Sequence, residues 1–298
     1  MGTLEGNGMQ TQHIIGAAFA CAGILAPLTY AQAPLRQDEQ TQSLLNRSVI
    51  YSDRFERSLG QALKHSSYKG SHLASRLEDW SKHMHEELKQ AAHRYREGGP
   101  YAVSPGTHTQ NALVAAQGIN RAMIGEAFPP IVQQDWAALR DNLNQLAAVW
   151  KRPPIPAGGA EFIPAGQAPP LSAAQTGVLL ENIHDAASRF EDHFDRAAGQ
   201  YRVVSKNSGF YKGIAKGLDD ATERAAGAYR DNDMRKFRIN LQDTFVLAAA
   251  MNRTMAETEF SPMLEAEWDS LRRNLNTLAA ANGFPPLPEY YPQRYLTD

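Results

Sequence analysis

The chain has 298 residues, a length that as a soft prior suggests about two domains. Hydrophobic residues make up 43% and charged residues 21%, which is typical of globular proteins and not of disordered chains. The formal net charge of −2 provides no basic excess of the kind that nucleic-acid grooves carry, and there is no acidic block. We therefore expect a folded protein that does not bind nucleic acid.

The amino terminus predicts export. The run HIIGAAFACAGILAPLTYAQA is apolar and ends in small residues, which is typical of a secretory signal peptide. Cleavage after Ala31 is favoured over cleavage after Ala33, because the second would place Pro34 first. The segment before the run has no Lys or Arg and contains Glu5, and translation from Met9 would remove that acid. The alternative is an uncleaved anchor, although the run is short and interrupted by Gly and Pro for a membrane span.

The single cysteine, Cys21, lies inside this apolar run. One alternative makes Cys21 the lipidated residue of a lipoprotein, but the preceding AAFA lacks the expected Leu. After cleavage at Ala31 the mature chain has no cysteine, which excludes disulfides, cysteine nucleophiles, thiolate zinc sites and covalent haem. No second long apolar stretch follows, so we expect a periplasmic or extracellular protein without a transmembrane span.

An internal repeat organises the rest of the sequence. The stretch WAALRDNLNQLAAVWKRPPIP (136–156) returns as WDSLRRNLNTLAAANGFPPLP (268–288), 132 residues later. At the same offset INRAM matches MNRTM and FPPI matches FSPM, whereas upstream the offset becomes 135. The tripeptide YKG also occurs in both halves, and the second segment of the first half is longer, which suggests a helix extended by about two turns.

Each half reads as four helices, because apolar residues recur at the helical period and no convincing period-2 strand is present. The last helix of each half is the clearest, since its apolar residues step by four and three as in a helical bundle. Those residues are Val132, Trp136, Leu139, Leu143, Leu146 and Trp150 in the first half, and Leu264, Trp268, Leu271, Leu275 and Leu278 in the second.

Prolines mark the ends of these helices, because proline cannot donate the helical hydrogen bond. We predict an all-α, internally duplicated protein of two four-helix-bundle units joined by a Pro/Gly/Ala-rich linker. Stacking of all eight helices into one body is the alternative. The predicted segments are a signal peptide (1–31), a first repeat (32–151), the linker (152–171), a second repeat (172–283) and a Pro/Tyr-rich tail (284–298). The phrases RPPIP and PPLPEYYP could bind a partner as polyproline ligands, but helix termination explains them without a partner.

The repeated Trp and Arg residues are the first candidate binding groups. Trp136 and Arg140 are four residues apart, as are Trp268 and Arg272, so each guanidinium shares a helix face with an indole. A platform for anionic or glycan groups is one interpretation. Packing is the favoured one, with a core-edge Trp covered by an Arg.

Asparagines form the second group of candidates. Asn120 and Asn252 occupy positions in the third helices where the period calls for an apolar residue. A buried amide at such a position can fix helix register, and this is the favoured interpretation over a solvent-facing or ligand-binding role. In the closing helices, Asn144 and Asn276 are not explained by the apolar period. Their neighbours Asn142 and Asn274 are not explained by it either.

The histidines are candidate metal ligands, because helical bundles can hold metals in their interiors. Glu181 and His184 form a Glu-x-x-His pair, but the first half has Asn46 and Val49 at the matching positions, so no second pair exists. The histidines at 83, 85 and 93 flank an apolar stripe and read as surface residues with at most weak zinc or copper binding. No HExxH, GxSxG or phosphate-binding glycine motif is present, so no cofactor is predicted and the sequence leans away from an enzyme.

The closing phrase W-x2-LR-x-N-L-N-x-LA, behind a signal peptide, resembles a group of exported bacterial proteins of unknown function. The resemblance covers Leu44–Pro156 and Leu179–Pro288. It implies export and an all-α bundle and brings no catalytic residues. We expect a non-catalytic protein that binds an unknown protein partner or acts as a structural component of the cell envelope or secretome. The alternatives are a metal- or cofactor-binding bundle, and an enzyme with a site in only one repeat.

Overall fold

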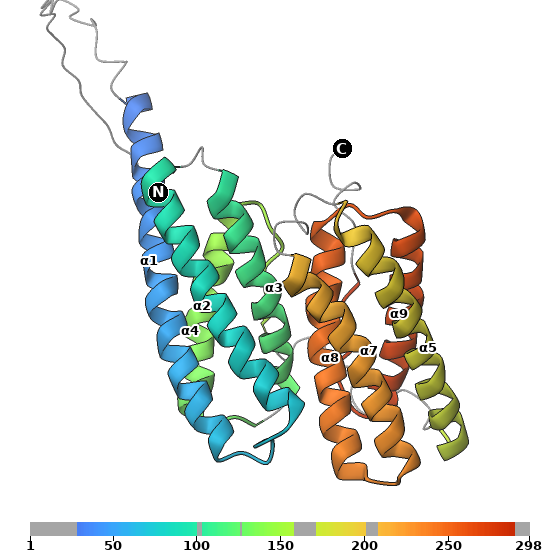
Figure 1. Ribbon diagram of the computed structural model, residues 1–298. Helices are drawn as coiled ribbons and strands as arrows, with labels where there is room; N and C mark the ends of the chain where they lie inside the picture. The colour runs from blue at the N-terminus through green and yellow to red at the C-terminus, as the bar shows by residue number, and fades with distance from the viewer. Residues whose placement is uncertain (1–28, 100–102, 126, 158–170, 201–207, 290–298) are drawn as a thin grey trace, which may run out of the picture. The chain divides into compact units, whose positions relative to one another are not determined.

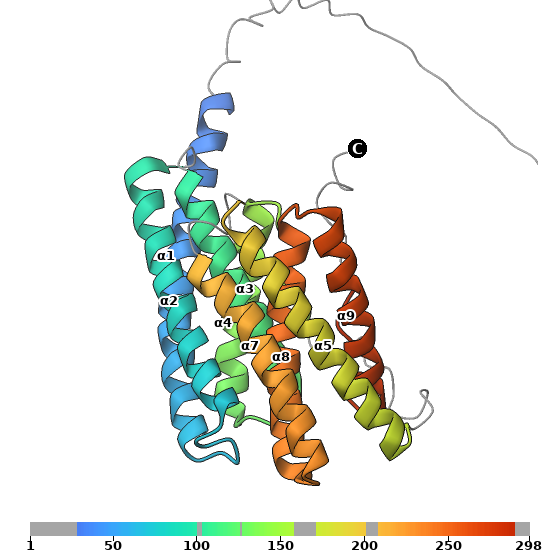
Figure 2. The ribbon, with the colours of Figure 1, turned by 45° about the vertical axis from the view of Figure 1, so that its right-hand side comes forward.

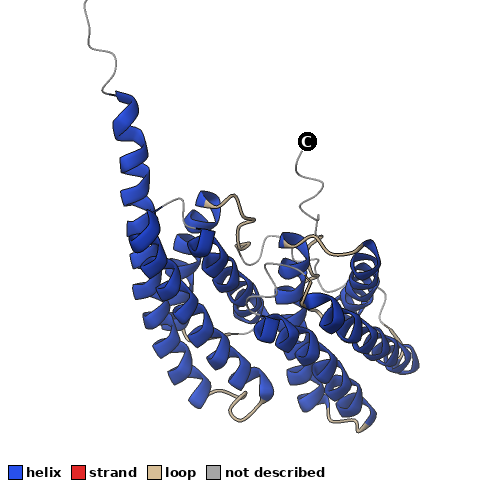
Figure 3. Cartoon of the chain, turned by 45° about the horizontal axis from the view of Figure 1, so that its top comes forward, coloured by secondary structure: helices blue, strands red, loops and turns tan. Residues whose placement is uncertain are grey.

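The protein is all-helical in every part of the chain that the structure describes (Figures 1 and 3), which confirms the all-α part of the predicted fold. The structure, a computed structural model, describes residues 29–99, 103–125, 127–157, 171–200 and 208–289. These residues contain eight helices: α1 (Thr29–Lys64), α2 (His72–Gly98), α3 (Val103–Gly125), α4 (Pro130–Val149), α5 (Ala173–Ala198), α7 (Ser208–Arg230), α8 (Met234–Glu257) and α9 (Pro262–Ala281). None of the described helices is both long and apolar enough to cross a membrane.

Local sequence signals explain where several helices begin. Ser172 and Gln175 form a reciprocal capping box at the start of α5, so that each side chain accepts a backbone N–H that the helix leaves unpaired. Ser261 caps α9 by accepting from the Leu264 backbone N–H, and Pro262 occupies the first turn. Beyond α4 and α9 the chain turns back as two extended, proline-rich stretches, residues 153–156 and 285–288, which we call the return segments.

The apolar stripes of the closing helices α4 and α9 are buried, except for Trp150, which follows the end of α4 and is half-buried. Phe55 of α1 packs on Trp136 with ring centroids 5.1 Å apart and planes 49° apart. Phe190 of α5 packs on Trp268 at 5.3 Å and 48°, so the two halves repeat this contact closely. The buried stripes of α1 and α5 end at Leu63 and Ala198.

Helices α3 and α8 join the two halves. Each packs against helices of its own half, and they also pack against each other within the compact unit Asp38–Asp298 (Figure 2). The sequence left open whether the halves pack together, and they do. Residues 109–122 of α3 and 241–255 of α8 are buried all round, where the sequence predicts a single buried stripe. The reason is that neighbouring helices cover both faces of α3 and α8. The small residues in ALVAAQGI and VLAAAM allow these neighbours to pack closely.

Two sequence expectations differ from the structure. The first YKG (68–70) lies in the turn before α2, whereas Tyr211 of the second lies buried inside α7, so the two tripeptides are not equivalent. Helix α2 has 27 residues and α7 has 23, a difference of about one turn and not two. Most of the predicted signal peptide (1–28), most of the predicted linker (158–170) and the tyrosines of the tail (290, 291 and 295) lie outside the described residues.

A glycine in α3 provides a test of this close helix packing. A Cβ atom on Gly118 would lie 1.9 Å from Cζ3 of the buried Trp80 of α2, so Gly118→Ala must displace the indole. We expect a loss of about 1–3 kcal/mol in the free energy of unfolding, from overpacking. Urea denaturation followed by circular dichroism measures it. Gly227→Ala in α7 is the control, because its Cβ meets nothing within 4 Å and helix propensity favours Ala. Equal midpoints for Gly118→Ala and the unaltered chain would contradict the packing.

Candidate functional site

The predicted Trp and Asn residues meet in a buried hydrogen-bond chain that holds a return segment. The Trp136 indole Nε1–H donates to Oδ1 of Asn120 at 3.0 Å, and the Asn120 Nδ2 donates to the carbonyl of Pro156 at 3.1 Å. Asn120 and Trp136 are 1% and 3% exposed, so the indole N–H and the Asn120 amide need these partners. The second half repeats the arrangement: Trp268 to Asn252 at 3.2 Å and Asn252 to Pro288 at 3.2 Å.

A second amide on each closing helix grips the same return segment. Asn144 donates from Nδ2 to the Ile155 carbonyl at 3.0 Å and accepts from the Ile155 backbone N–H at 2.7 Å. Asn276 makes both bonds to Leu287, at 3.1 and 2.7 Å. A carboxamide has the same donor and acceptor as a peptide group, so each Asn pairs with the backbone as a strand would.

The neighbouring asparagines differ between the halves. Asn142 is buried and donates to the Leu44 carbonyl at 2.9 Å and to the hydroxyl of Ser48 at 2.5 Å, which ties α4 to α1. Its counterpart Asn274 is half-buried, and the residue of α5 that corresponds to Ser48 is the apolar Ile183.

Two buried arginines cross between the halves, and sequence reasoning missed them. Arg121 of α3 donates to the carbonyls of Pro285 and Pro286, the latter at 3.4 Å. Arg253 of α8 donates to the carbonyl of Pro153 at 2.7 Å, so each half holds the return segment of the other. The signal in the sequence was the Arg shared by INRAM and MNRTM, at the repeat offset of 132.

The two guanidinium groups have different neighbours. Burial lowers the pKa of the Arg121 guanidinium to about 10, and its charge lies 5.0 Å over the Phe245 ring. Burial also lowers the pKa of Arg253, against the opposing effect of Glu257, whose carboxylate is 2.7 Å away. Gly125 occupies the position of Glu257 in the first half. A pKa of about 10 keeps Arg121 charged near neutral pH.

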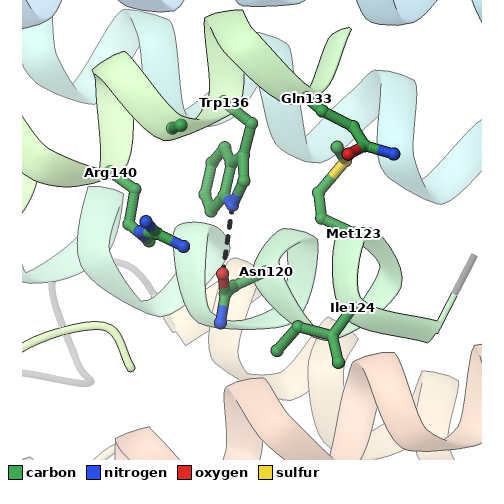
Figure 4. Close-up of a pocket in the computed structure, with 7 residues that line it drawn as sticks. Asn120, Met123, Ile124, Gln133, Trp136 and Arg140 are labelled. Atoms are coloured by element: carbon green, nitrogen blue, oxygen red, sulfur yellow. Dashed lines mark hydrogen bonds between the residues drawn. The ribbon is translucent and has the colours of Figure 1, made fainter. Parts of the chain in front are cut away.

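The first half has a pocket of ≈ 360 Å³ between α3 and α4 (Figure 4). Figure 4 shows Arg140 on one side of the Trp136 indole, with Gln133 and Met123 on the other. Three of the predicted site residues therefore share one pocket. Its lining is Asn120, Met123, Ile124, Gln133, Trp136, Ala137 and Arg140.

The matching region of the second half carries different charges. Ala137 corresponds to Asp269, whose carboxylate is 2.8 Å from Nη2 of Arg272, and Gln133 corresponds to Glu265. Arg272 also donates to the Pro288 carbonyl at 3.4 Å. Arg272 and Asn276 line a separate pocket of ≈ 950 Å³ beside the second return segment. The sequence-predicted residues thus occupy equivalent backbone positions with unequal surroundings.

A polar cluster lies where α2 and α3 meet α7. Glu87 accepts from Asn111 at 3.0 Å and lies 2.8 Å from Nδ1 of His108, while the Tyr211 hydroxyl donates to Oδ1 of Asn111 at 2.7 Å. The imidazole of His83 lies 4.0 Å from Oε1 of Glu87. It also stacks on the ring of Phe210, with centroids 4.0 Å apart.

Burial and hydrogen bonding in this cluster lower two pKa values. Burial lowers the pKa of His83, against the attraction of Glu87. Burial alone would raise the pKa of Glu87, but hydrogen bonds from His108 and Asn111 outweigh it and the pKa is lowered. The fold therefore favours neutral His83 and ionised Glu87.

The histidines weighed as metal ligands have other neighbours. His184 lies 3.3 Å from the Asp219 carboxylate, and Glu181 lies 3.5 Å from Arg230. His85 shares a 2.8 Å hydrogen bond with Ser52, and His93 lies 3.2 Å from Glu97. No group of three His, Cys, Asp or Glu side chains placed to hold a metal ion occurs among the described residues.

Comparison with known proteins gave no match: no family model, no curated protein and no solved structure is similar to this chain. The chemistry of the site therefore rests on the geometry described above.

The asparagine grip on the return segments can be measured directly. Asn144→Ala and Asn276→Ala each remove an acceptor and a donor from a partly buried backbone. We expect each to lower the free energy of unfolding by about 1–3 kcal/mol in urea denaturation. Asn274→Ala, on α9 together with Asn276, is the matched control, with an expected change of about 0.5 kcal/mol or less. A loss for Asn144→Ala no larger than that of the control would show that the grip does not contribute.

The lowered pKa values of His83 and Glu87 predict that acid weakens the contribution of this cluster to the stability of the fold. Below the ordinary His83 pKa of 6.5, the unfolded chain takes up a proton that the folded chain resists. Below the ordinary Glu87 pKa of 4.5, the unfolded carboxylate protonates before the folded one does. Both effects make the free energy of unfolding fall as pH decreases from about 7 to about 4.

Urea midpoints measured across this range test the sign. His83→Gln should flatten the decline between about pH 6.5 and 5. His93→Gln, at a half-exposed position, is the control and should leave the decline unchanged. A midpoint that rises on acidification would contradict the described cluster.

Proposed function

We propose that this chain is an exported, non-catalytic helical protein that binds a protein partner or serves as a structural component of the cell envelope or secretome. We further propose that it arose by duplication of a four-helix-bundle unit, with a Pro/Gly/Ala-rich linker between the copies. The repeated contacts of Trp136, Asn120 and Asn144 with their own return segment, matched in the second half, support the duplication.

One observation carries the non-catalytic proposal. The asparagines that the chain keeps at 120 and 252, and at 144 and 276, use their hydrogen bonds within the protein itself. Asn120 and Asn252 each accept from an indole and donate to a proline carbonyl, and Asn144 and Asn276 each make two backbone bonds. Side chains already satisfied in this way stabilise a rigid body and have little capacity left to act on a substrate.

Export is supported by the apolar amino-terminal run with small residues before Ala31. The resemblance of the closing helices to those of exported bacterial helical proteins points the same way.

Purification of the chain from the exported fraction of its host tests these two points together. We expect the mature protein to begin at Gln32, by amino-terminal sequencing, because cleavage follows Ala31. Elemental analysis should find no stoichiometric transition metal, and the absorption spectrum should show only aromatic residues. A chain retained in the cytoplasm with its leader intact would overturn export. Stoichiometric iron, copper or haem would favour the cofactor-binding bundle.

Partner binding needs its own experiment, and the repeat supplies matched positions. Ile131 and Met263 are exposed large hydrophobic residues at equivalent places, at the starts of α4 and α9. A photo-crosslinking amino acid at each, in the living host, should give a discrete adduct with an identified envelope or secreted protein. The absence of adducts at these sites and along the exposed face of α5 would overturn partner binding and leave a spacer role.

A further inference from the structure

We propose that the pocket between α3 and α4 of the first half binds a carboxylate that carries an apolar body, with Arg140 as the group that holds the charge. This goes beyond the proposed function, because the pocket would take such a ligand whether or not the chain is exported or binds a protein.

Arg140 has donor capacity that the fold does not use. Its side chain is 20% exposed, and Nε is buried without a hydrogen-bond partner. Its ion pair is a 3.5 Å contact with the adjacent Asp141, which is 69% exposed and contributes little because water screens it. A guanidinium has five N–H donors in a planar fork that matches a carboxylate, so a bound carboxylate would complete it.

In the second half a carboxylate pairs with the arginine at this position. The equivalent Arg272 pairs with the Asp269 carboxylate at 2.8 Å, one helical turn before it. In the first half that position is Ala137, which lines the pocket. The exchange of Asp for Ala removes an internal carboxylate and leaves space beside the guanidinium. Asp269 is thus an intramolecular counterpart of the ligand that Arg140 lacks.

The remaining walls select the body of the ligand. Trp136, Met123 and Ile124 present apolar surface, and the pocket of ≈ 360 Å³ suits a small molecule or one or two residues of a peptide. The polar atoms of Asn120 are already committed to Trp136 and Pro156. Gln133 uses its Nε2 on the Phe128 carbonyl. With one cation and few free donors, the pocket matches a monocarboxylate better than a phosphate, which needs more donors.

The carboxylate could come from a free organic acid or from the carboxyl terminus of a peptide, and two probes separate these sources. The first probe is 3-phenylpropionate, and the second is the peptide acetyl-Ala-Ala-Phe with a free carboxylate. The uncharged 3-phenylpropionamide is the control for charge. Titration of the full mature chain is followed by the indole N–H signal of Trp136 in ¹H–¹⁵N NMR, assigned with Trp136→Phe.

We expect at least one carboxylate probe to shift this signal saturably, and the amide to bind about tenfold more weakly or worse. Arg140→Gln should weaken binding about tenfold or more, whereas Arg272→Gln, at the equivalent position, should leave it unchanged. Ala137→Asp, which copies the second half, should abolish binding because its carboxylate pairs with Arg140. Its thermal unfolding by circular dichroism verifies that the variant is folded. Saturation by the peptide alone would identify a chain end as the source.

Several outcomes would overturn the site. These are no saturable shift with either carboxylate up to about 10 mM, equal binding of the amide, and unchanged binding in Arg140→Gln. Unchanged binding in a folded Ala137→Asp variant would overturn it as well. None of them bears on export or on partner crosslinking, so the failure of this site would leave the proposed function intact.

Discussion

The rest of the fold depends on where two buried guanidinium groups find hydrogen-bond acceptors. Arg121 and Arg253 are 7% and 5% exposed, and a buried charge without partners costs several kcal/mol. Their acceptors are the carbonyls of prolines in the extended return segment of the opposite half. Those carbonyls are free because an extended segment makes no helical bonds, and proline has no N–H that needs a partner of its own. Each half therefore satisfies the buried charge of the other.

The sequence was sufficient for the features that periodicity and local chemistry determine. The stripe through Trp136 and Leu143 predicts a buried helix face, and the proline phrases predict where the helices end. The sequence could not show that α3 and α8 are covered on all sides, because a run of alanines and glycines fits either a surface or a core. The roles of Asn144 and Arg121 were equally hidden, since their partners are backbone carbonyls, which no residue type encodes.

The two halves show how one backbone tolerates different charges. Asn111 of α3 corresponds to Asp243 of α8, which accepts from Arg76 at 2.7 Å and from Arg224 at 3.1 Å. Asn111 instead links Glu87 to Tyr211. The acidic residue lies on α2 in the first half (Glu87) and on α8 in the second (Asp243). The polar side chains around it are hydrogen-bonded in both halves. The amides that hold the backbone are the same in both halves, whereas the charged positions around them differ: Arg140 has the exposed Asp141 beside it, where Arg272 has Asp269.

The reciprocal grip of the arginines also bears on how such a protein assembles. A single unit that carries both an arginine like Arg121 and a return segment like 153–156 has the donor and the acceptor needed to pair with a second copy of itself, in the manner of a symmetric homodimer. Covalent joining of two units turns that association into an intramolecular one, with an effective concentration in the millimolar range for a short linker. The pairing then no longer depends on how much of the protein the cell makes, and each copy becomes free to change independently of the other.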